Sequence, residues 1–385
     1  MKLLLVLSRF PYPLEKGDKL RAYHQIRVLS RKHELYLFAL SDQKIPSFSL
    51  EALAPYCQQI RVGRINICSK MVNSFLFFLK GLPIQCGYFF NWKAKKQLME
   101  FVKEVQPDRI YAQLVRTAPY VQEISIEKTI DYQDVFSQGM LRRAQKAPFW
   151  QKPFFKMESR RLQRYEAAVF DDFQHHTIIT EVDRDLMPVN EKERILVVGN
   201  GVDFEQFQYR GQPKKYDLMF AGNMAYAPNV DAAEFLVKQI LPRLLPQFPD
   251  LRLVLCGANP SKRVQALRGP HVTVTGWVES MSEYYAQSRI FIAPMRLGTG
   301  LQNKLLEAMA TQLPCVTSPL AGKPLKGAVP QHDILICEHI ENYVNAITQL
   351  LTDSAYYQQI SQQGYQYVRE NYSWEVMTGV LIDEL

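Results

Sequence analysis

Lys304 and Glu307 are the two charged residues of an apolar helical pattern that follows a glycine-rich turn in GTGLQNKLLEAMA, residues 298–310. Gly298 and Gly300 let a backbone approach a ligand closely, and the N–H groups at a helix start attract an anion. The i, i+3 spacing sets the lysine and the carboxylate on one helix face. A ligand that contains a diphosphate beside a ribose needs both groups, since the lysine can neutralise the phosphates and the carboxylate can bind the sugar hydroxyls. The alternative is an ordinary strand, loop and helix whose lysine and glutamate form an exposed pair.

The elements that must position these residues recur in both halves of the chain. A length of 385 residues is too great for one ordinary core. Short strand patterns alternate with helical patterns, which predicts an α/β protein with two Rossmann-like domains and parallel sheets. We expect a first, acceptor-side domain over residues 1–195, a second over 200–370, and a last helix at about 372–385 that could pack back onto the first. Such sheets bind ligands at the carboxyl ends of their strands, so the active site is expected in a central cleft that both sheets face.

The expected strands are short and apolar, as buried parallel strands are. They are KLLLVLS, ELYLFAL, DRIYAQL and KTIDYQD in the first half, and YDLMFAG, LRLVLCG, VTVTGWV, IFIAPM, PCVTS and ILIC in the second. Residues 230–245 and 303–310 are expected to be helical.

Cysteine usage and hydropathy predict a cytoplasmic protein. The six cysteines are spread out and form no C-x-x-C pair. The N-terminal apolar run stops at Ser8 and Arg9, before it reaches signal-peptide length. No apolar stretch approaches the ~18 residues that a spanning helix needs.

A basic and aromatic segment predicts a further contact. Residues 142–164 hold eight basic residues against the single acid Glu158, and residues 75–90 (FLFFLKGLPIQCGYFF) add apolar bulk. Basic residues attract phosphate groups of any source, so the partner of this segment could be an anionic membrane surface or a nucleic acid. The third possibility is a solvated helix face with no partner. We expect a peripheral contact with the anionic inner-membrane surface and no nucleic acid, because no recognition module is present. The basic residues are Arg142, Arg143, Lys146, Lys152, Lys156, Arg160, Arg161 and Arg164, and Phe149, Trp150, Phe154 and Phe155 lie between them.

Residues 290–318, IFIAPMRLGTGLQNKLLEAMATQLPCVTS, resemble the donor-site segment of family 4 retaining glycosyltransferases, which have the GT-B fold. Further resemblances are RFPYPLEKGDKLRAYH to the family's first glycine-bearing loop, VVGNGVDFEQF to its interdomain segment, FAGNMAYAPNVDAAEFL to the start of its second lobe, and VTVTGWVESMSEYYAQSRIFIAP to its nucleotide-base region. The sequence forms RxPYPxxKGDKxR and GxQNKxLEAMA resemble those of the sugar transferases that are encoded with bacterial exopolysaccharide and exosortase systems. The resemblance covers nearly the full chain.

The resemblance implies a UDP- or GDP-linked sugar as donor substrate, with no cofactor and no metal. Glu307 matches the second glutamate of the family's E-x7-E motif, which holds the donor ribose, whereas Thr299 stands where the first would be. The family's diphosphate-gripping arginine and lysine correspond to Asn223 and Pro228, so Lys304 is expected to help neutralise the phosphates. The implied donor-binding residues are Gly17, Gly222, Asn223, Trp277, Val278, Thr299, Gly300, Leu301, Gln302, Asn303 and Glu307.

The resemblance also assigns catalytic and acceptor-side roles. In the family, a histidine after the fourth strand often contacts the transferred sugar. Gln133 stands near that position in this sequence, so Asp134 or Asp131 is the remaining polar candidate. The expected catalytic residues are Lys304, Asp134 and Arg296, and the expected acceptor-side residues are Arg9, Lys19, Arg21 and Asp131. For Lys19 and Arg21, contact with a phosphate-bearing acceptor and charge capping around Asp18 are equal alternatives.

The histidines are expected to be structural. His24 is placed among the structural residues of the first helix, with acceptor contact as the alternative. His175 and His176 directly precede a further expected strand, TIIT, and lack a third ligand at metal-binding spacing, so surface or strand-edge roles are expected.

The implied reaction is retaining, hexosyl-type sugar transfer to a lipid-linked or glycan acceptor in cell-surface polysaccharide biosynthesis. Charge on the nucleoside diphosphate leaving group is the main demand, and Lys304, Arg296 and a helix N-terminus could meet it without a metal. A same-fold alternative is a nucleotide-sugar 2-epimerase. A non-catalytic, basic protein that binds anionic surfaces is the alternative from another class.

Overall fold

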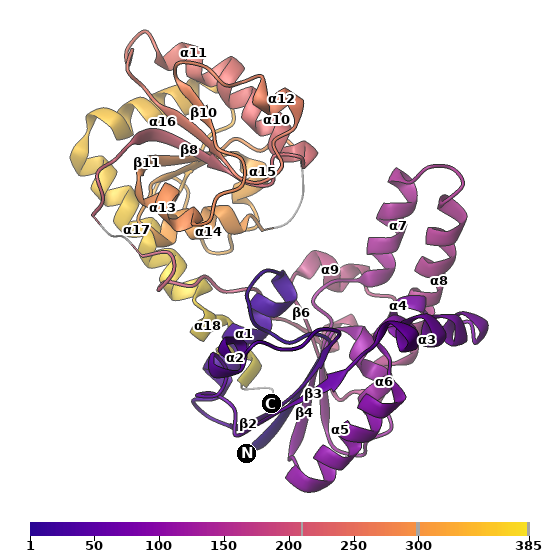
Figure 1. The fold of residues 1–385 in the computed structure, drawn as a ribbon. Coiled ribbons are helices and arrows are strands. Elements are labelled where there is room, and N and C mark those ends of the chain that lie inside the picture. The colour runs from indigo at the N-terminus through magenta and orange to yellow at the C-terminus, as the bar shows by residue number, and fades with distance from the viewer. Residues whose placement is uncertain (209–210, 298–300, 383–385) are drawn as a thin grey trace. The chain divides into compact units, whose positions relative to one another are not determined.

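A computed structural model describes residues 1–208, 211–297 and 301–382 of the chain. The chain divides into two compact units, the first made of Met1–Asn200 and the residues from Met377 onward, the second of Gly201–Val376. Each unit is a parallel sheet with helices packed against it (Figure 1). None of the described helices is both long and apolar enough to cross a bilayer.

The sheet of the first unit has, among the described residues, seven parallel strands in the order β3-β2-β1-β4-β5-β6-β7. Its centre is β1, in which every residue from Leu3 to Leu7 is buried. Successive strand side chains point to opposite faces. Leu4 and Val6 therefore join one hydrophobic core, and Leu3 and Leu5 join the other. The strands are β1 (Lys2–Leu7), β2 (Glu34–Ser41), β3 (Gln59–Arg64), β4 (Arg109–Gln113), β5 (Lys128–Asp131), β6 (His175–Ile178) and β7 (Ile195–Val197).

Helices cover both faces of this sheet. The last helix of the chain, α18 (Trp374–Ile382), crosses from the second unit to the first, and its Leu381 is buried in the core that contains Leu3 and Leu5. The other helices of the first unit are α1 (Gly17–Leu29), α2 (Ser47–Glu51), α3 (Ile67–Leu79), α4 (Ile84–Phe89), α5 (Trp92–Val105), α6 (Ala118–Val121), α7 (Phe136–Lys146), α8 (Lys152–Ala168) and α9 (Glu181–Leu186), with short 3-10 turns at Val115–Thr117, Phe170–Asp172 and Lys192–Arg194.

The sheet of the second unit has, within the described part of the chain, six parallel strands in the order β10-β9-β8-β11-β12-β13. The strand order reverses direction between β8 and β11, and loops at such a point diverge to leave room for a ligand at the carboxyl ends of the strands. The strands are β8 (Tyr216–Ala221), β9 (Leu253–Cys256), β10 (Val272–Val274), β11 (Ser288–Ala293), β12 (Cys315–Thr317) and β13 (Leu335–Ile336).

The helix predicted over residues 230–245 is interrupted. It begins earlier, as α10 (Ala227–Phe235), passes through a π-helical turn (Leu236–Ile240), and ends in α11 (Leu241–Leu244). Pro242 lies at the start of α11 and has no backbone N–H to continue an α-helical ladder, which explains the wider turn before it. The remaining helices are α12 (Lys262–Gln265), α13 (Met281–Ala286), α14 (Asn303–Ala310), α15 (Pro319–Gly322), α16 (Ile340–Thr352) and α17 (Ser354–Tyr372).

Candidate active site

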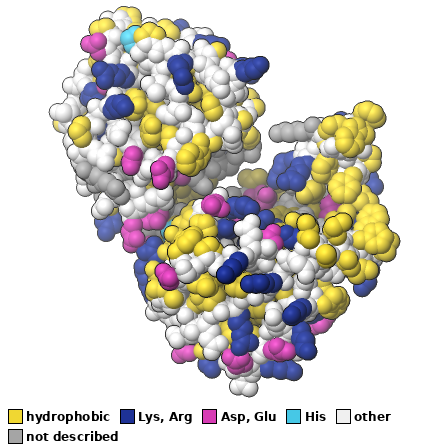
Figure 2. All heavy atoms as spheres, viewed as in Figure 1, with side chains coloured by type: hydrophobic (Ala, Val, Ile, Leu, Met, Phe, Trp, Pro, Cys, Tyr) yellow, Lys and Arg dark blue, Asp and Glu magenta, His cyan; other side chains and the backbone are white. Residues whose placement is uncertain are grey.

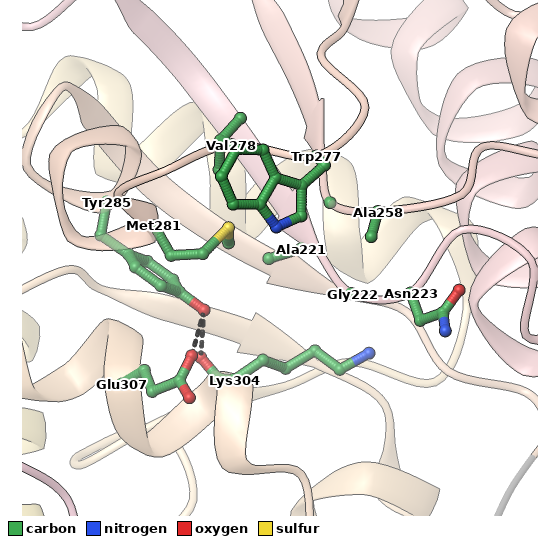
Figure 3. A pocket seen from close by; sticks show the side chains of 11 residues that line it. Ala221, Gly222, Asn223, Ala258, Trp277, Val278, Met281, Tyr285, Lys304 and Glu307 are labelled. Atoms are coloured by element: carbon green, nitrogen blue, oxygen red, sulfur yellow. Dashed lines mark hydrogen bonds between the residues drawn. The ribbon is translucent and has the colours of Figure 1, made fainter. Parts of the chain in front are cut away.

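A cavity of about 360 Å³ opens in the second unit, where β8, β9 and β10 end. Its wall is formed by the loops that follow these strands together with α13 and α14. This is the edge at which parallel α/β sheets bind their ligands. The residues around it are Ala221, Gly222, Asn223, Gly257, Ala258, Trp277, Val278, Met281, Tyr285, Lys304 and Glu307 (Figure 3).

Lys304 and Glu307 reach the cavity from the same side because both lie on α14. Figure 3 shows their side chains diverging, with Glu307 toward Tyr285 and Lys304 toward the loop that carries Gly222 and Asn223. The cavity therefore has a cationic end and an acidic end.

Lys304 is held in place by contacts with Asn229, Phe220 and Met295. Its Nζ donates a hydrogen bond to Oδ1 of Asn229 at 2.6 Å, and it lies 4.7 Å from the ring centroid of Phe220. Burial lowers the pKa of Lys304 to about 8, although the nearby charge of Glu307 acts in the opposite direction. The buried ammonium of Lys304 has lost part of its contact with water, so an anionic ligand stabilises it more than it would stabilise an exposed lysine.

Glu307 is oriented by Tyr285. The Tyr285 hydroxyl donates to Oε2 of Glu307 at 2.9 Å, and among the described residues Oε1 has no hydrogen-bond partner. Burial raises the pKa of Glu307, while the Tyr285 hydrogen bond and the charge of Lys304 oppose that change. A fixed carboxylate with an available oxygen can accept hydrogen bonds from sugar hydroxyls.

Two glycines allow the loops after β8 and β9 to pack tightly at this cavity. Gly222 and Gly257 have φ of 152° and 141°, where other residues are strained. A Cβ at Gly257 would lie 1.9 Å from the carbonyl oxygen of Gly222, and a Cβ at Gly222 would lie 2.6 Å from Nδ2 of Asn229. The two loops can therefore pack this closely only because both residues are glycine.

The side of the cavity opposite α14 is apolar. Trp277 lines it although 75% of its surface is exposed, so the indole ring offers a face to a planar group. Val278 and Met281 are partly buried beside it and pack against the core of the unit. Aromatic rings at a cavity rim stack on nucleobases without preference for sequence.

The turn that leads into α14 is described only from Leu301 onward. Gln302 is the N-cap residue, Asn303 is the first residue of the helix, and Leu301 packs against the core. None of these three is among the described residues that line the cavity. Thr299 and Gly300, with Gly298, lie outside the described residues, so the predicted roles of Thr299 and Gly300 stay predictions.

Arg296 is engaged elsewhere in the second unit. Its Nε and Nη2 donate to the two carboxylate oxygens of Asp231 at 3.0 and 2.7 Å, and its guanidinium lies 4.6 Å from the ring centroid of Phe235. It is not among the described residues that line the cavity. A direct catalytic role for Arg296 stays a prediction.

In the first unit, Gly17 is the first residue of α1 and Lys19 is half-buried in its first turn. Arg9 pairs with Asp18, and its guanidinium lies 5.3 Å from the ring centroid of Phe89.

Arg116, which the sequence did not suggest, lies against the same Phe89 ring at 4.3 Å and reaches Asp18 at 3.8 Å. Two arginines and one aspartate thus meet beside the loop that resembles the family's first glycine-bearing loop.

Arg21 and Asp131 form a buried pair inside the first unit. Nε and Nη2 of Arg21 donate to the two oxygens of Asp131 at 2.7 and 3.2 Å, and both side chains are fully buried. Thr177 donates to Asp131 at 3.0 Å, and Arg21 also donates to the Gly199 carbonyl at 3.1 Å. Their polar atoms are thus used within the fold, and contact with an acceptor stays a prediction.

Asp134 is the exposed member of the predicted acidic pair. It is paired with Arg142 at 3.4 Å and lies after β5. Its predicted catalytic role stays a prediction.

The expected surface or strand-edge position is wrong for His176. Both His175 and His176 lie in β6, which is an interior strand, and the His176 ring is buried and stacked on Phe170 at 3.8 Å. Burial lowers the pKa of His176 to about 3. His175 is half-exposed and lies 2.7 Å from Glu127, and His24 is buried in α1. No cluster of metal-binding side chains occurs in the portion of the chain that is described.

Sequence reasoning missed several residues that line the cavity or contact its lining residues. Asn229, Tyr285 and Met281 were not singled out, although Tyr285 orients Glu307 and Asn229 contacts Lys304. Gly257 and Ala258 could have been found, because Gly257 ends the predicted strand LRLVLCG and Ala258 directly follows it at the ligand-binding end of the sheet.

Comparisons with known proteins agree with this arrangement. Residues 215–353 match the family described as "Glycosyl transferases group 1". A Klebsiella pneumoniae protein named "Uncharacterized 44.6 kDa protein in cps region" is 22% identical, and the alignment covers 96% of each chain. A solved glycosyltransferase from Rickettsia africae is similar at a TM-score of 0.65 and 12% identity, covering 100% of this chain and 97% of its own. HepE from Anabaena in complex with UDP is similar at a TM-score of 0.64 and 13% identity, covering 100% and 99%.

These matches support glycosyl transfer as the class of activity. The match over residues 215–353 includes every described residue that lines the cavity. The chain therefore has the GT-B fold of two Rossmann-like α/β domains, and residues 215–353 in its second unit are similar to the glycosyl transferases group 1 family.

Proposed function

We propose that this chain is a glycosyltransferase that moves a sugar from a nucleoside-diphosphate sugar to a hydroxyl of a lipid-linked or glycan acceptor. The observation that carries the proposal is the cavity with Lys304 at one end, Glu307 at the other and Trp277 across from them. A nucleoside diphosphate offers a charge to the lysine, ribose hydroxyls to the carboxylate and a planar base to the indole ring. HepE, a structural neighbour, has been solved with UDP and with UDP-glucose, which supports a nucleotide-sugar donor here.

In the proposed complex the diphosphate lies near Lys304 and the backbone of Gly222. The bond from the anomeric carbon to the diphosphate oxygen breaks, and negative charge develops on that oxygen. A preorganised cation at this place stabilises the charge more in the transition state than in the bound donor. Glu307 accepts hydrogen bonds from the ribose and contributes to donor binding rather than to bond cleavage.

The stereochemistry and the metal requirement follow the family that the sequence resembles. The acceptor oxygen attacks the face that the diphosphate leaves, and its proton passes to the departing phosphate oxygen, so the anomeric configuration is retained. Lys304 supplies positive charge at the leaving group, which supports a reaction without a metal. The Klebsiella relative is named for a cps region, and this is consistent with a role in cell-surface polysaccharide synthesis.

The proposal is tested in two steps with the full chain. A thermal-shift panel of UDP, GDP and their sugars should show stabilisation by one nucleotide class, because a ligand that binds only the folded state raises its stability. With the donor so identified, Lys304→Ala should lose about a hundredfold to a thousandfold in turnover, the usual effect of removing one group that faces developing charge. Lys323→Ala, a change at an exposed lysine of the same unit, is the control. Turnover of Lys304→Ala within about fivefold of the unaltered protein would contradict the proposed site.

The product distinguishes the alternatives. A glycosyltransferase releases nucleoside diphosphate only when an acceptor is present. A nucleotide-sugar 2-epimerase of this fold would consume the donor without an acceptor, and a non-catalytic protein that binds anionic surfaces would do neither.

A further inference from the structure

Helix α3 presents an apolar face that the first unit does not cover. Its single buried residue is Asn73, which donates to the carbonyl of Phe90 at 2.9 Å and fixes the inner side of the helix. Ile67 is 73% exposed and Phe75 is 60% exposed. Soluble proteins seldom expose apolar side chains in a continuous row, and such rows mark interaction sites. The exposed apolar residues of α3 are Ile67, Met71, Val72, Phe75, Leu76, Phe78 and Leu79.

The hairpin of α7 and α8 carries a second group of the same kind. Phe149 and Trp150, in the connection between the two helices, are 84% and 67% exposed. Phe154 on α8 and Leu141 on α7 are also exposed. Figure 2 shows hydrophobic side chains gathered over the part of the first unit that holds α3 and this hairpin, with lysine and arginine beside them.

Helices α3, α4 and α8 are connected through specific contacts. The Arg161 guanidinium of α8 lies 4.5 Å from the ring centroid of Phe78 on α3. The backbone N–H of Gln85 on α4 donates to Oε1 of Glu158 on α8 at 3.2 Å. We call the exposed side chains of residues 67–80 and 141–164 together the apolar–basic face.

The charged residues exposed on the apolar–basic face are of one sign, and the exposed carboxylates Asp134 and Asp42 beside it are paired with Arg142 and Lys70. Residues 66–90 contain no aspartate or glutamate, and residues 136–168 contain only Glu158 and Glu166. Both of these are buried, at 3% and 1% exposure, and each accepts a backbone N–H inside the unit. The carboxylates of this segment are thus directed inward. Its exposed basic residues include Lys80, Arg142, Arg143, Lys156, Arg160 and Arg164.

We propose that the apolar–basic face docks the protein peripherally on an anionic phospholipid bilayer. Exposed Ile, Leu, Met, Phe and Trp side chains enter the interfacial layer, and lysine and arginine bind lipid phosphates around them. The inference goes beyond sugar transfer, because binding to lipid does not depend on the donor cavity of the second unit.

Other occupants fit the face less well. A second copy of the chain would bring two cationic surfaces together, and like charges across an interface oppose association. A nucleic acid would satisfy the arginines but not the aliphatic residues Ile67, Met71 and Leu79, which have no base or phosphate to contact. An anionic bilayer matches both the apolar and the basic residues.

The test is vesicle flotation of the full chain. Vesicles of phosphatidylcholine alone are compared with vesicles that also contain phosphatidylglycerol, at low and at high salt. The protein should float with the anionic vesicles, bind neutral ones about tenfold more weakly or worse, and lose binding as salt rises, because the headgroup attraction is screened.

Variants locate the contact. Phe75→Ser with Leu79→Ser, and separately Arg160→Glu with Arg164→Glu, should each weaken anionic-vesicle binding by about tenfold or more. These side chains are exposed, so the fold is expected to persist, which circular dichroism checks. Val182→Ser and Lys32→Glu change an equally exposed apolar and an exposed basic residue away from the face, and they should bind vesicles as the unaltered protein does.

Several outcomes would overturn the proposal. The proposal fails if the protein does not float with anionic vesicles, if it binds neutral vesicles equally well, or if the control variants lose as much binding as the variants of the apolar–basic face. Binding to duplex DNA as tight as to vesicles would point to nucleic acid. A concentration-dependent dimer that Phe75→Ser with Leu79→Ser dissolves, without vesicle binding, would assign the face to a second copy. None of these results changes the test of donor binding, so the two proposals can fail separately.

Discussion

Lys304 Nζ lies 2.6 Å from Oδ1 of Asn229, a residue 75 positions earlier in the chain. The same amide donates from Nδ2 to the Asn223 carbonyl at 3.0 Å. Asn229 is 6% exposed and therefore connects the cation of α14 to the loop that follows β8. The position of the positive charge in the cavity thus depends on a neutral side chain that need not touch the ligand.

Asn229→Ala should weaken nucleoside diphosphate binding by about tenfold or more, because a hydrogen bond to a charged group is worth about 1.5 to 3 kcal/mol. We expect the loss in the dissociation constant measured by calorimetry, together with a loss of about 1 to 3 kcal/mol of the free energy of unfolding, because Lys304 and the Asn223 carbonyl each lose a buried partner. Asn190→Ala, at an exposed asparagine of the first unit, is the control. Equal affinity for Asn229→Ala and the unaltered protein would remove Asn229 from this positioning role.

Donor affinity should depend on pH through Lys304. Its pKa of about 8 means that the side chain is charged below that pH and loses its proton above it. A bound diphosphate favours the charged form, so affinity should be level from about pH 7 to about pH 8 and then fall by up to about tenfold per pH unit. Calorimetric titrations across this range measure the slope. Lys304→Met should flatten it, and an unchanged slope in that variant would assign the titration to another group.

Glu307→Gln should weaken binding of the donor more than it slows the bound complex, because the carboxylate is proposed to hold the ribose. Tyr285→Phe keeps the shape of the site but removes the hydrogen bond that orients Glu307. It should give a smaller change in the same direction. Single-turnover kinetics separate the two effects. An unchanged donor dissociation constant for Glu307→Gln would place the ribose elsewhere.

The buried pair of Arg21 and Asp131 should determine the stability of the first unit. Asp131→Asn or Arg21→Met leaves a buried partner without its counter-charge, and such changes cost about 3 to 5 kcal/mol of the free energy of unfolding. Urea denaturation measures the loss. Arg142→Ala breaks the exposed pair with Asp134 and should cost less than about 1 kcal/mol. A loss for Arg21→Met as small as that for Arg142→Ala would contradict a structural role.

The sequence predicted the strands of both sheets best where they are buried on both faces. In the first unit it left out β3 and β7, which are the two edge strands. The edge strand β3 is partly open to water and carries Arg61 and Arg64, so its pattern lacks the continuous apolar run that marks a central strand. The other edge strand, β7, is apolar but only three residues long.

The sequence predicted the part of the candidate site that lies on a single helix. Lys304 and Glu307 share α14, and their spacing alone places them on one face. Tyr285 and Asn229 come from other elements, and sequence spacing carries no information on which side chains the folded sheet brings together. Arg21 and Asp131 were predicted to lie on the acceptor side, and only the fold shows that both are fully buried and pair with each other, which is rare for charged residues.

The most direct test of the account is a crystal structure of the full chain with the nucleoside diphosphate that the thermal-shift panel selects. The account predicts the diphosphate within hydrogen-bond distance of Lys304 Nζ, the ribose hydroxyls at Glu307 and the base beside Trp277. A nucleotide that is bound with full occupancy in another place, with this cavity holding only solvent, would contradict it.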